Sequence, residues 1–319
     1  MEKKDLSKIT PPELINYGEY IAGDMIQPSW DIPSKIVITC AITGAFISKE
    51  QNIKQPYTPE EIAKEAIECC KAGISGLHIH VRDENGHPTG DPQIFHRAID
   101  PILEKFPDMI IDCPTHYGKT VEDALKWAKE GLIEISPVRP SPSYTAEELI
   151  TTSPEATIAM TKLLQELGIK PQIAIFYVGM VDNAYRYLIR TGILEKPFYW
   201  IIMPGLPGGD MSNPMAMFES LLIYVRRIKE IDPASVWIVG STGRASCYLT
   251  TAAILLGGHI RVGMEDILYR YPHKDVMVTS NVEEVGMAIQ LAGLLGREVA
   301  SPDEYRKLIG LKPKSETKG

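Results

Sequence analysis

The stretch GLHIHVRDENG, residues 76–86, sets two histidines two positions apart in an otherwise apolar run. Side chains at positions i and i+2 of a β-strand project from the same face, so His78 and His80 point the same way. Apolar residues alternate with them and predict that the strand is buried. The fold therefore has to place two imidazoles side by side on one face of an interior strand.

On both sides of this strand, short β-rich runs alternate with longer segments of helical periodicity. The first helical segment has clear boundaries, because Thr58 suits an N-cap, Pro59 the first helical position and Gly73 the end. The predicted strands span residues 35–40, 76–81, 108–113, 132–136, 171–177, 198–203, 235–240 and 259–262. The predicted helical segments span residues 58–73, 91–105, 119–130, 154–168, 181–192, 213–230, 244–257 and 282–297.

Eight strand–helix units, with strands that read as continuous apolar runs, predict an α/β fold of the (β/α)₈ TIM barrel type. An open, doubly wound sheet is disfavoured, because no GxGxxG turn follows the first strand. Residues 1–34 hold four prolines and little periodicity, and we expect an N-terminal extension that wraps over the domain. Residues 35–319 are expected to form the catalytic barrel domain.

The composition of the 319-residue chain narrows the choice of partners. A net charge of −8 argues against nucleic acid, whose phosphates require a clustered basic surface. No run of 18 apolar residues exists, and the N-terminus lacks the apolar core of a secretory signal, so we expect no membrane partner. Five cysteines without a paired framework suit a reducing cytoplasm.

The His78–His80 pair has the chemistry of a metal site. In a (β/α)₈ barrel, catalytic groups lie where the strands end and lead into helices. Two neutral imidazoles and one carboxylate, with a fourth position open to substrate, form a common catalytic zinc site. The sequence GMED after the last strand offers Glu265 or Asp266 as the carboxylate. We therefore predict a site for zinc or another divalent transition metal.

Other residues that follow predicted strands are candidates for substrate contacts. Thr115 and His116 follow the strand 108–113, where they can reach a ligand. The stretch MPGLPGGDMS, residues 203–212, contains Gly208 and Gly209, and its backbone suits an anionic or pantetheine-like group. The remaining polar positions near strand ends are Thr39, Arg82, Asp112, Glu134, Ser136, Arg139, Tyr177, Ser241, Arg244 and Arg261.

The other histidines carry weaker signals. We expect His87, His96 and His273 to be exposed in loops or on helical faces. His259 begins the last strand, at the end of the barrel away from the chemistry, so we expect it to have a structural role.

Several segments together resemble the β-keto acid cleavage enzyme family. They are TCAITGA (39–45), PYTPEEIAKEA (56–66), AGISGLHIHVRDENGHPT (72–89), VGMVD (178–182), LPGG (206–209) and GGHIRVGMEDILY (257–269). The resemblance runs from about residue 35 to 310. It implies a (β/α)₈ barrel with a divalent metal, usually zinc. It also implies acyl exchange between a β-keto acid and acetyl-CoA, which gives acetoacetate and a new acyl-CoA.

The resemblance also implies individual roles. His78, His80 and Glu265 would be the metal ligands, while Arg261 and Asp266 would form a charged pair beside the reacting carbons. Asp266, held by Arg261, is then the candidate general base, and Arg261 would stabilise the developing oxyanion. With the family in view, we expect small-molecule partners and a homo-oligomer, either a dimer or a tetramer.

Three positions depart from the family pattern. Members that cleave an amino-substituted keto acid carry an acidic residue directly after the AITGA loop, where this chain has Phe46. A serine expected after the third strand is replaced by Pro114, and the stretch IAIFYVG lacks an acid near the end of the fifth strand. These departures predict a substrate with an apolar or neutral tail rather than an ammonium group.

Two other classes of function remain open on the sequence. A metal-dependent hydrolase or aldolase on the same barrel would need further histidines and an aspartate after later strands, where Tyr177 and Met203 stand. A non-catalytic binder of metal or acyl-CoA would explain the missing acidic positions.

Overall fold

The computed structural model describes residue 8 and residues 29–115, 126–145, 148–206 and 209–316. Contacts between residues divide the chain into two units, Met1–Ile32 and Pro33–Gly319. The second unit holds all the elements described below. Most of the expected extension, residues 1–34, lies outside the described residues, so its wrapping over the domain and its boundary stay predictions.

Eight parallel strands of the second unit close into a barrel in the order β10-β11-β2-β3-β4-β5-β8-β9. They are β2 (Ile38–Ala41), β3 (Gly76–His78), β4 (Ile110–Asp112), β5 (Ile135–Val138), β8 (Lys170–Ile175), β9 (Tyr199–Ile202), β10 (Val236–Gly240) and β11 (His259–Val262). Their residues are almost all buried, because helices cover the outer face and side chains fill the interior. The structure confirms the predicted (β/α)₈ TIM barrel.

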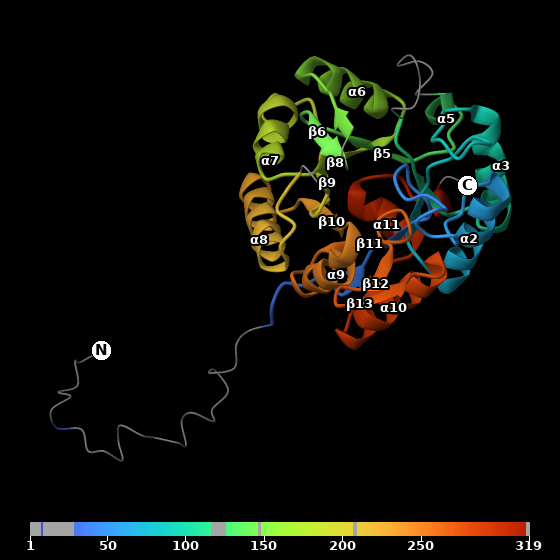
Figure 1. Cartoon of the computed structure of the whole chain (residues 1–319). Coiled ribbons are helices and arrows are strands. Elements are labelled where there is room, and N and C mark those ends of the chain that lie inside the picture. The colour runs from blue at the N-terminus through green and yellow to red at the C-terminus, as the bar shows by residue number, and fades with distance from the viewer. Residues whose placement is uncertain (1–7, 9–28, 116–125, 146–147, 207–208, 317–319) are drawn as a thin grey trace. The chain divides into compact units, whose positions relative to one another are not determined.

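Helices surround the strands (Figure 1). They are α2 (Pro59–Ala72), α3 (Pro92–Lys105), α5 (Lys126–Lys129), α6 (Pro154–Glu166), α7 (Gly179–Ala184) with the π-helical turn η3 (Tyr185–Ile189), α8 (Pro214–Ile231), α9 (Ser246–Leu255) after the turn η4 (Gly243–Ala245), and α10 (Asn281–Leu294). Where α2 begins, Thr58 and Glu61 form a capping box and Pro59 takes the first position. Helix α2 ends at Gly73, whose φ of 93° is left-handed.

The predicted strand 35–40 is divided into two strands, β1 (Lys35–Ile36) and β2, and several further short elements were not predicted from the sequence. A parallel pair joins β1 to β14 (Glu298–Val299), and two hairpins are formed by β6 (Ser143–Thr145) with β7 (Glu148–Ile150) and by β12 (Tyr269–Tyr271) with β13 (Lys274–Met277). The turn η5 (Lys314–Glu316) follows helix α11 (Pro302–Ile309). Strands of two to four residues are too short for a periodicity to reveal them.

Helix α11 lies across the amino-terminal ends of the barrel strands, in the middle of the view in Figure 1. The hydroxyl of Tyr305 bonds the hydroxyl of Tyr199, the first residue of β9, at 2.6 Å. The guanidinium of Arg306, whose side chain is fully buried, donates to both carboxylate oxygens of Glu134 at 2.6 Å. The prediction that Glu134 lies at the catalytic end was therefore wrong. Strand β5 begins at Ile135, later than the apolar run suggested.

His259 lies at this same end, as the sequence predicted. Its Nδ1 accepts a hydrogen bond from the backbone N–H of Val37 at 3.0 Å. Burial, together with the positive charges of Arg297 and Lys229, lowers the pKa of His259 to about 3. His87 and His273 are exposed, whereas His96 is partly covered by ion pairs. His259 is thus a neutral, structural histidine at pH 7.

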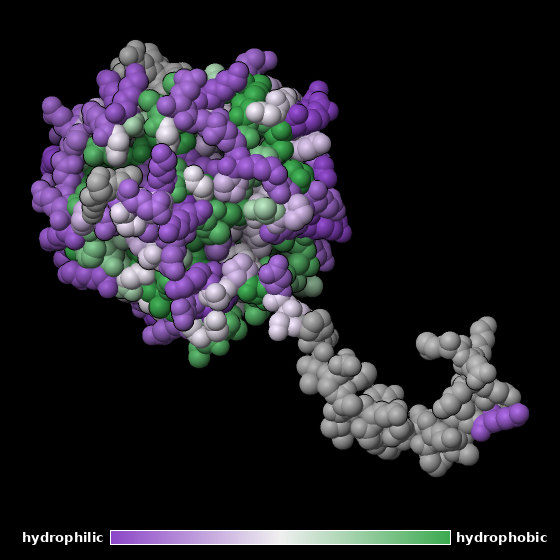
Figure 2. All heavy atoms as spheres, turned by 180° about the vertical axis from the view of Figure 1, so that it is seen from behind, coloured by the Kyte–Doolittle hydropathy of each residue, from purple (hydrophilic) through white to green (hydrophobic). Residues whose placement is uncertain are grey.

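The outward-facing residues of the barrel unit are mostly polar. Figure 2 shows hydrophilic side chains over much of one face, with smaller apolar areas between them. Among the described residues, no helix combines the length and the apolar character needed to cross a bilayer.

The neutral state of His259 predicts a pH dependence of stability. An unfolded histidine has a pKa of about 6.5. The unfolded chain therefore binds a proton below that pH, while the folded chain resists it until about pH 3. The contribution of His259 to the free energy of unfolding should be intact above pH 6.5 and should fall by up to about 1.4 kcal/mol per pH unit on acidification.

Urea unfolding between pH 7 and pH 4.5 should show a smaller loss of stability for His259→Gln than for the wild type. The exposed control, His87→Gln, should follow the wild type. Parallel profiles for all three proteins would contradict this assignment.

Candidate active site

The two histidines of the opening stretch converge at the carboxyl end of the barrel. His78 ends β3, His80 follows two residues later, and their Nε2 atoms lie 3.0 Å apart. Nδ1 of His78 bonds a carboxylate oxygen of Asp112 at 2.9 Å, and Asp112 is paired with His78 in the register of β3 and β4. An ionised carboxylate can only accept, so Nδ1 of His78 carries the proton. Burial opposes the charge of His78, but Glu265 and Asp112 outweigh it and raise the pKa of His78 to about 9, so a metal that binds Nε2 has to displace a proton there.

Glu265 completes a three-residue cluster. Its Oε1 lies 3.3 Å from Nε2 of His78 and 3.5 Å from Nε2 of His80. One ligand atom from each of the three residues lies within 4.8 Å of the others. Burial disfavours the charge of Glu265, but His78, His80 and Arg261 outweigh it and hold the pKa of Glu265 well below its usual range. The buried Oε2 of Glu265 has no hydrogen-bond partner among the described residues.

This donor set fits a divalent transition metal. Two imidazole nitrogens and a carboxylate are ligands that zinc accepts in catalytic sites, and the hydrogen bond from His78 to Asp112 is the outer contact that usually orients such a ligand. The unpartnered oxygen of Glu265 is an acceptor left over for a cation.

A second charged pair lies beside the cluster. Arg261, on β11, donates from Nε to Asp266 at 2.9 Å and from Nη2 to the other carboxylate oxygen at 2.6 Å. Nη2 also reaches Oε1 of Glu265 at 3.3 Å. Burial raises the pKa of Asp266 to about 6, assisted by Glu265 and opposed by Arg261. A side chain at Gly240 of β10 would place its Cβ 2.9 Å from Nε of Arg261, so the glycine leaves room for the guanidinium.

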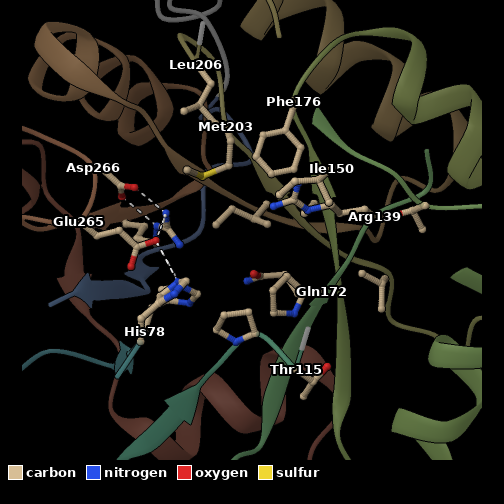
Figure 3. A pocket seen from close by; sticks show the side chains of 18 of the residues that line it. His78, Thr115, Arg139, Ile150, Gln172, Phe176, Met203, Leu206, Glu265 and Asp266 are labelled. Atoms are coloured by element: carbon tan, nitrogen blue, oxygen red, sulfur yellow. Dashed lines mark hydrogen bonds and ion pairs between the residues drawn. The ribbon is translucent and has the colours of Figure 1, made fainter. Parts of the chain in front are cut away.

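A cavity of about 230 Å³ lies against both groups of residues (Figure 3). His78, His80, Arg261, Glu265 and Asp266 line one part of it. Much of the rest is apolar and comes from Val138, Ile150, Met160, Phe176, Met203 and Leu206. The cavity thus joins a charged, metal-competent end to a mostly apolar end, where Arg139 lies over the ring of Phe176 at 4.7 Å from its centroid.

Some of the residues predicted to contact the substrate line the cavity, and others lie elsewhere or outside the described residues. Phe46 and Thr115 both line the cavity, and the hydroxyl of Thr115 lies 3.2 Å from that of Ser136. Gly209 packs against the backbone of Phe176, where a Cβ would lie 2.9 Å from the carbonyl oxygen. His116 and Gly208 lie outside the described residues. Their roles, and those of the other predicted site residues, stay predictions.

The sequence reasoning missed the function of two residues. Asp112 was noted as the end of a strand, but nothing in its own segment indicated that it would orient His78. Gln172, in β8, lines the cavity and was not singled out. Tyr177, considered as a rim residue, bonds Ser141 at 3.0 Å and lies in a neighbouring pocket.

The AITGA loop packs against Glu265 of the cluster. Gly44 lies so close to Glu265 that an added Cβ would overlap Cγ of the glutamate. The buried guanidinium of Arg82 donates to the carbonyl oxygens of Gly44 and Ile47 and fixes this loop. Gly44 therefore leaves room for Glu265, and Arg82 holds the loop that carries Gly44.

Comparisons with known proteins agree with this geometry. A family model described as beta-keto acid cleavage enzyme matches residues 35–311, from β1 to just beyond α11. The chain is similar to a 3-keto-5-aminohexanoate cleavage enzyme of Fusobacterium nucleatum, with 35% identity over 288 residues that cover 87% of this chain and 98% of the relative.

Two more distant proteins extend the comparison. A 3-dehydrocarnitine:acetyl-CoA trimethylamine transferase of Rhizobium meliloti is 27% identical over 87% of this chain and 97% of its own length. The solved structure of apo ObcA matches 81% of this chain and 66% of that chain with a TM-score of 0.69. At 19% identity, the ObcA structure supports the barrel fold alone.

The contact between Gly44 and Glu265 predicts a variant with a displaced carboxylate. Gly44→Ala should push Glu265 out of the cluster and weaken the binding of zinc or cobalt about tenfold or more, in the range found when the support of a ligand is lost. Isothermal titration of the metal-stripped protein measures this affinity. Gly286→Ala on α10 is the matched control, because an added Cβ there meets nothing within 4 Å. Equal metal affinities in the two variants would show that Gly44 has no such function.

Proposed function

The chain belongs to the beta-keto acid cleavage enzyme family, and we propose that its cavity carries out a metal-dependent acyl transfer from a β-keto acid to coenzyme A. It is an enzyme that cleaves a β-keto acid with acetyl-CoA as the second substrate. The observation that carries the proposal is the buried convergence of His78, His80 and Glu265 next to the Arg261–Asp266 pair.

In the proposal, His78, His80 and Glu265 hold the metal, with zinc favoured over magnesium because two of the ligands are nitrogens. A divalent ion held there supplies Lewis acidity toward the keto oxygen of the substrate. Asp112 keeps His78 in the tautomer that presents Nε2, and Arg261 balances part of the negative charge of Glu265.

The proton chemistry falls to Asp266. One of its carboxylate oxygens takes a proton from C2 of the keto acid, which lies between the carboxylate and the keto group, and an enolate results. Arg261 bonds both oxygens of Asp266 and so fixes their position for this transfer. The same guanidinium stabilises the oxyanion that develops when C2 attacks the acetyl carbonyl of acetyl-CoA.

The remaining bonds change without a further reactant. The attack of C2 on the acetyl carbonyl expels the CoA thiolate. The thiolate then attacks the original keto carbon, and the bond between that carbon and C2 breaks. The acyl group leaves as a new CoA thioester, and C2 regains the proton from Asp266 to give acetoacetate. Acetoacetate therefore keeps C1 and C2 of the keto acid and receives its other two carbons from the acetyl group.

The finer parts of the proposal concern assembly and location. All five cysteines are free thiols, which suits the expected cytoplasmic location. A dimer or tetramer, as expected from the family resemblance, completes the proposal. The hydrolase or aldolase alternative has no additional support among the described residues, where His78, His80 and Glu265 form the one metal-competent group of three found.

The metal assignment predicts the composition of the purified protein. Elemental analysis should find about one zinc, or another divalent transition metal, per chain. His78→Ala/His80→Ala should lose it, because a single carboxylate retains a metal poorly. The control His87→Ala/His96→Ala removes two histidines outside the site and should keep the metal. Unchanged metal content in the first double variant would sink the assignment.

The role of Asp266 predicts a defect in the first chemical step. Asp266→Asn should keep the metal, because Glu265 remains, but should slow proton–deuterium exchange at C2 of the keto acid at least about 100-fold. Exchange measured by NMR without acetyl-CoA isolates this step. Arg261→Lys should also be impaired, because lysine cannot bond both oxygens of Asp266 in the same plane. Exchange at the wild-type rate in Asp266→Asn would assign the base elsewhere, with His116 next to be tested.

The position of Phe46 predicts that the enzyme discriminates against substrates whose tail carries an ammonium group. Among the described residues that line the cavity, the acidic ones are Glu265 and Asp266, and both contact Arg261. An ammonium group on the tail would be desolvated without a negatively charged group to balance it. The value of kcat/KM for 3-keto-5-aminohexanoate should therefore be at least about tenfold below that for 3-oxohexanoate, and Phe46→Glu should narrow the gap. Phe46→Leu, which adds no charge, should not narrow it. A preference of the wild type for the ammonium substrate would show that Phe46 does not act this way.

A further inference from the structure

Gln172 is a buried polar side chain in a part of the cavity that the chemistry does not use. It lies in β8, is 2% exposed and lines the cavity. Figure 3 shows it projecting into the space between His78 and the apolar side chains Phe176 and Ile150. Its Oε1 is buried and has no hydrogen-bond partner.

Two described side chains that line the cavity have such an unpartnered atom, Glu265 and Gln172. Buried polar atoms are nearly always paired in folded proteins, and at a cavity wall a bound molecule can supply the missing partner. A divalent cation accounts for the glutamate oxygen. It does not account for Gln172, which is not part of the metal-competent group. The remaining candidate for this partner is the substrate.

The position of the amide is fixed from outside the cavity. Gln172 lies in β8 next to β9, where it acts on Tyr199, and the hydroxyl of Tyr199 bonds Tyr305 of α11 at 2.6 Å. The side chain of Gln172 thus lies between the packed amino-terminal end of the barrel and the cavity that it lines. A preorganised, desolvated amide of this kind gives strong selectivity for a group that can bond it.

The chemistry of the partner follows from the surroundings. The engagement of Glu265 and Asp266 by Arg261, together with the guanidinium of Arg139, disfavours a positively charged tail, and Oε1 of Gln172 is an acceptor that cannot bond a carboxylate. A hydroxyl group is uncharged and can donate a hydrogen bond to Oε1 of Gln172, so it satisfies the unpartnered acceptor. We propose that Gln172 is a specificity-determining residue that selects β-keto acids with an uncharged hydroxyl group on the tail. This inference rests on the proposed acyl transfer and names its substrate class.

The test compares substrates that differ in one group. They are 3-oxohexanoate, its 5-hydroxy and 6-hydroxy derivatives, and its 5-amino derivative, each assayed with acetyl-CoA for the new acyl-CoA. The wild type should show kcat/KM for one hydroxylated substrate at least about tenfold above that for 3-oxohexanoate. Gln172→Met keeps the size and removes the hydrogen bond, so it should abolish or reverse this ratio while still turning over 3-oxohexanoate.

Two further variants complete the experiment. Gln172→Glu should raise the relative kcat/KM of the 5-amino substrate, because it supplies the missing charge. Gln55→Met is the matched control, since Gln55 is also buried with an unpartnered Oε1 but does not line the cavity. It should keep the wild-type ratio.

Two results would overturn the inference and leave the proposed function intact. One is equal hydroxyl-to-apolar ratios in the wild type and Gln172→Met. The other is an equal loss for every substrate, which would assign Gln172 to the shared carboxylate or to the fold. If the wild type forms no acyl-CoA from any of these substrates or from a wider β-keto acid panel, the proposed function fails and this inference fails with it.

Discussion

The carboxylate of Glu265 is the group on which the rest of the site depends. It faces His78, His80 and Arg261 in a buried space, and an unpaired charge there would be prohibitively unfavourable. Two of these three basic groups also bond a second acid, since Asp112 bonds His78 and Asp266 bonds Arg261. Removing one of these side chains therefore leaves the charge of its partner buried without full compensation. This mutual compensation explains how a barrel interior, normally filled by aliphatic side chains, tolerates so many ionisable groups.

The amino-terminal end of the barrel carries packing contacts, and the carboxyl end carries the candidate active site. At the amino-terminal end, α11 covers the strands through Tyr305 and Arg306, and His259 stays neutral in the packed interior. At the carboxyl end, the metal-competent cluster, the Arg261–Asp266 pair and the cavity lie together. Gln172 connects the two levels, because it contacts Tyr199 on one side and the cavity on the other. The packed end of the barrel can thereby hold the proposed specificity residue in place.

The barrel and the histidine pair could be predicted because they depend on periodicity. The alternation of strands and helices is a local signal, and so is the two-residue spacing of His78 and His80. Other features depend on tertiary placement. Local spacing could not distinguish Glu265 from Asp266, which are adjacent yet have different partners. Glu134 was assigned to the wrong end because an apolar run does not indicate where strand pairing begins. The roles of Asp112 and Gln172 arise from neighbours on other strands, and one segment cannot reveal them.

The central claim is that C2 of a β-keto acid forms a new bond to the acetyl group of acetyl-CoA. A wild-type reaction with unlabelled keto acid and acetyl-CoA that carries ¹³C in both acetyl carbons, followed by ¹³C NMR, tests it directly. The account predicts acetoacetate labelled at C3 and C4 only, together with an unlabelled new acyl-CoA. Label that stays in acetyl-CoA or is released as acetate, without labelled acetoacetate, would instead indicate a hydrolase, an aldolase or a non-catalytic binder and would contradict the account.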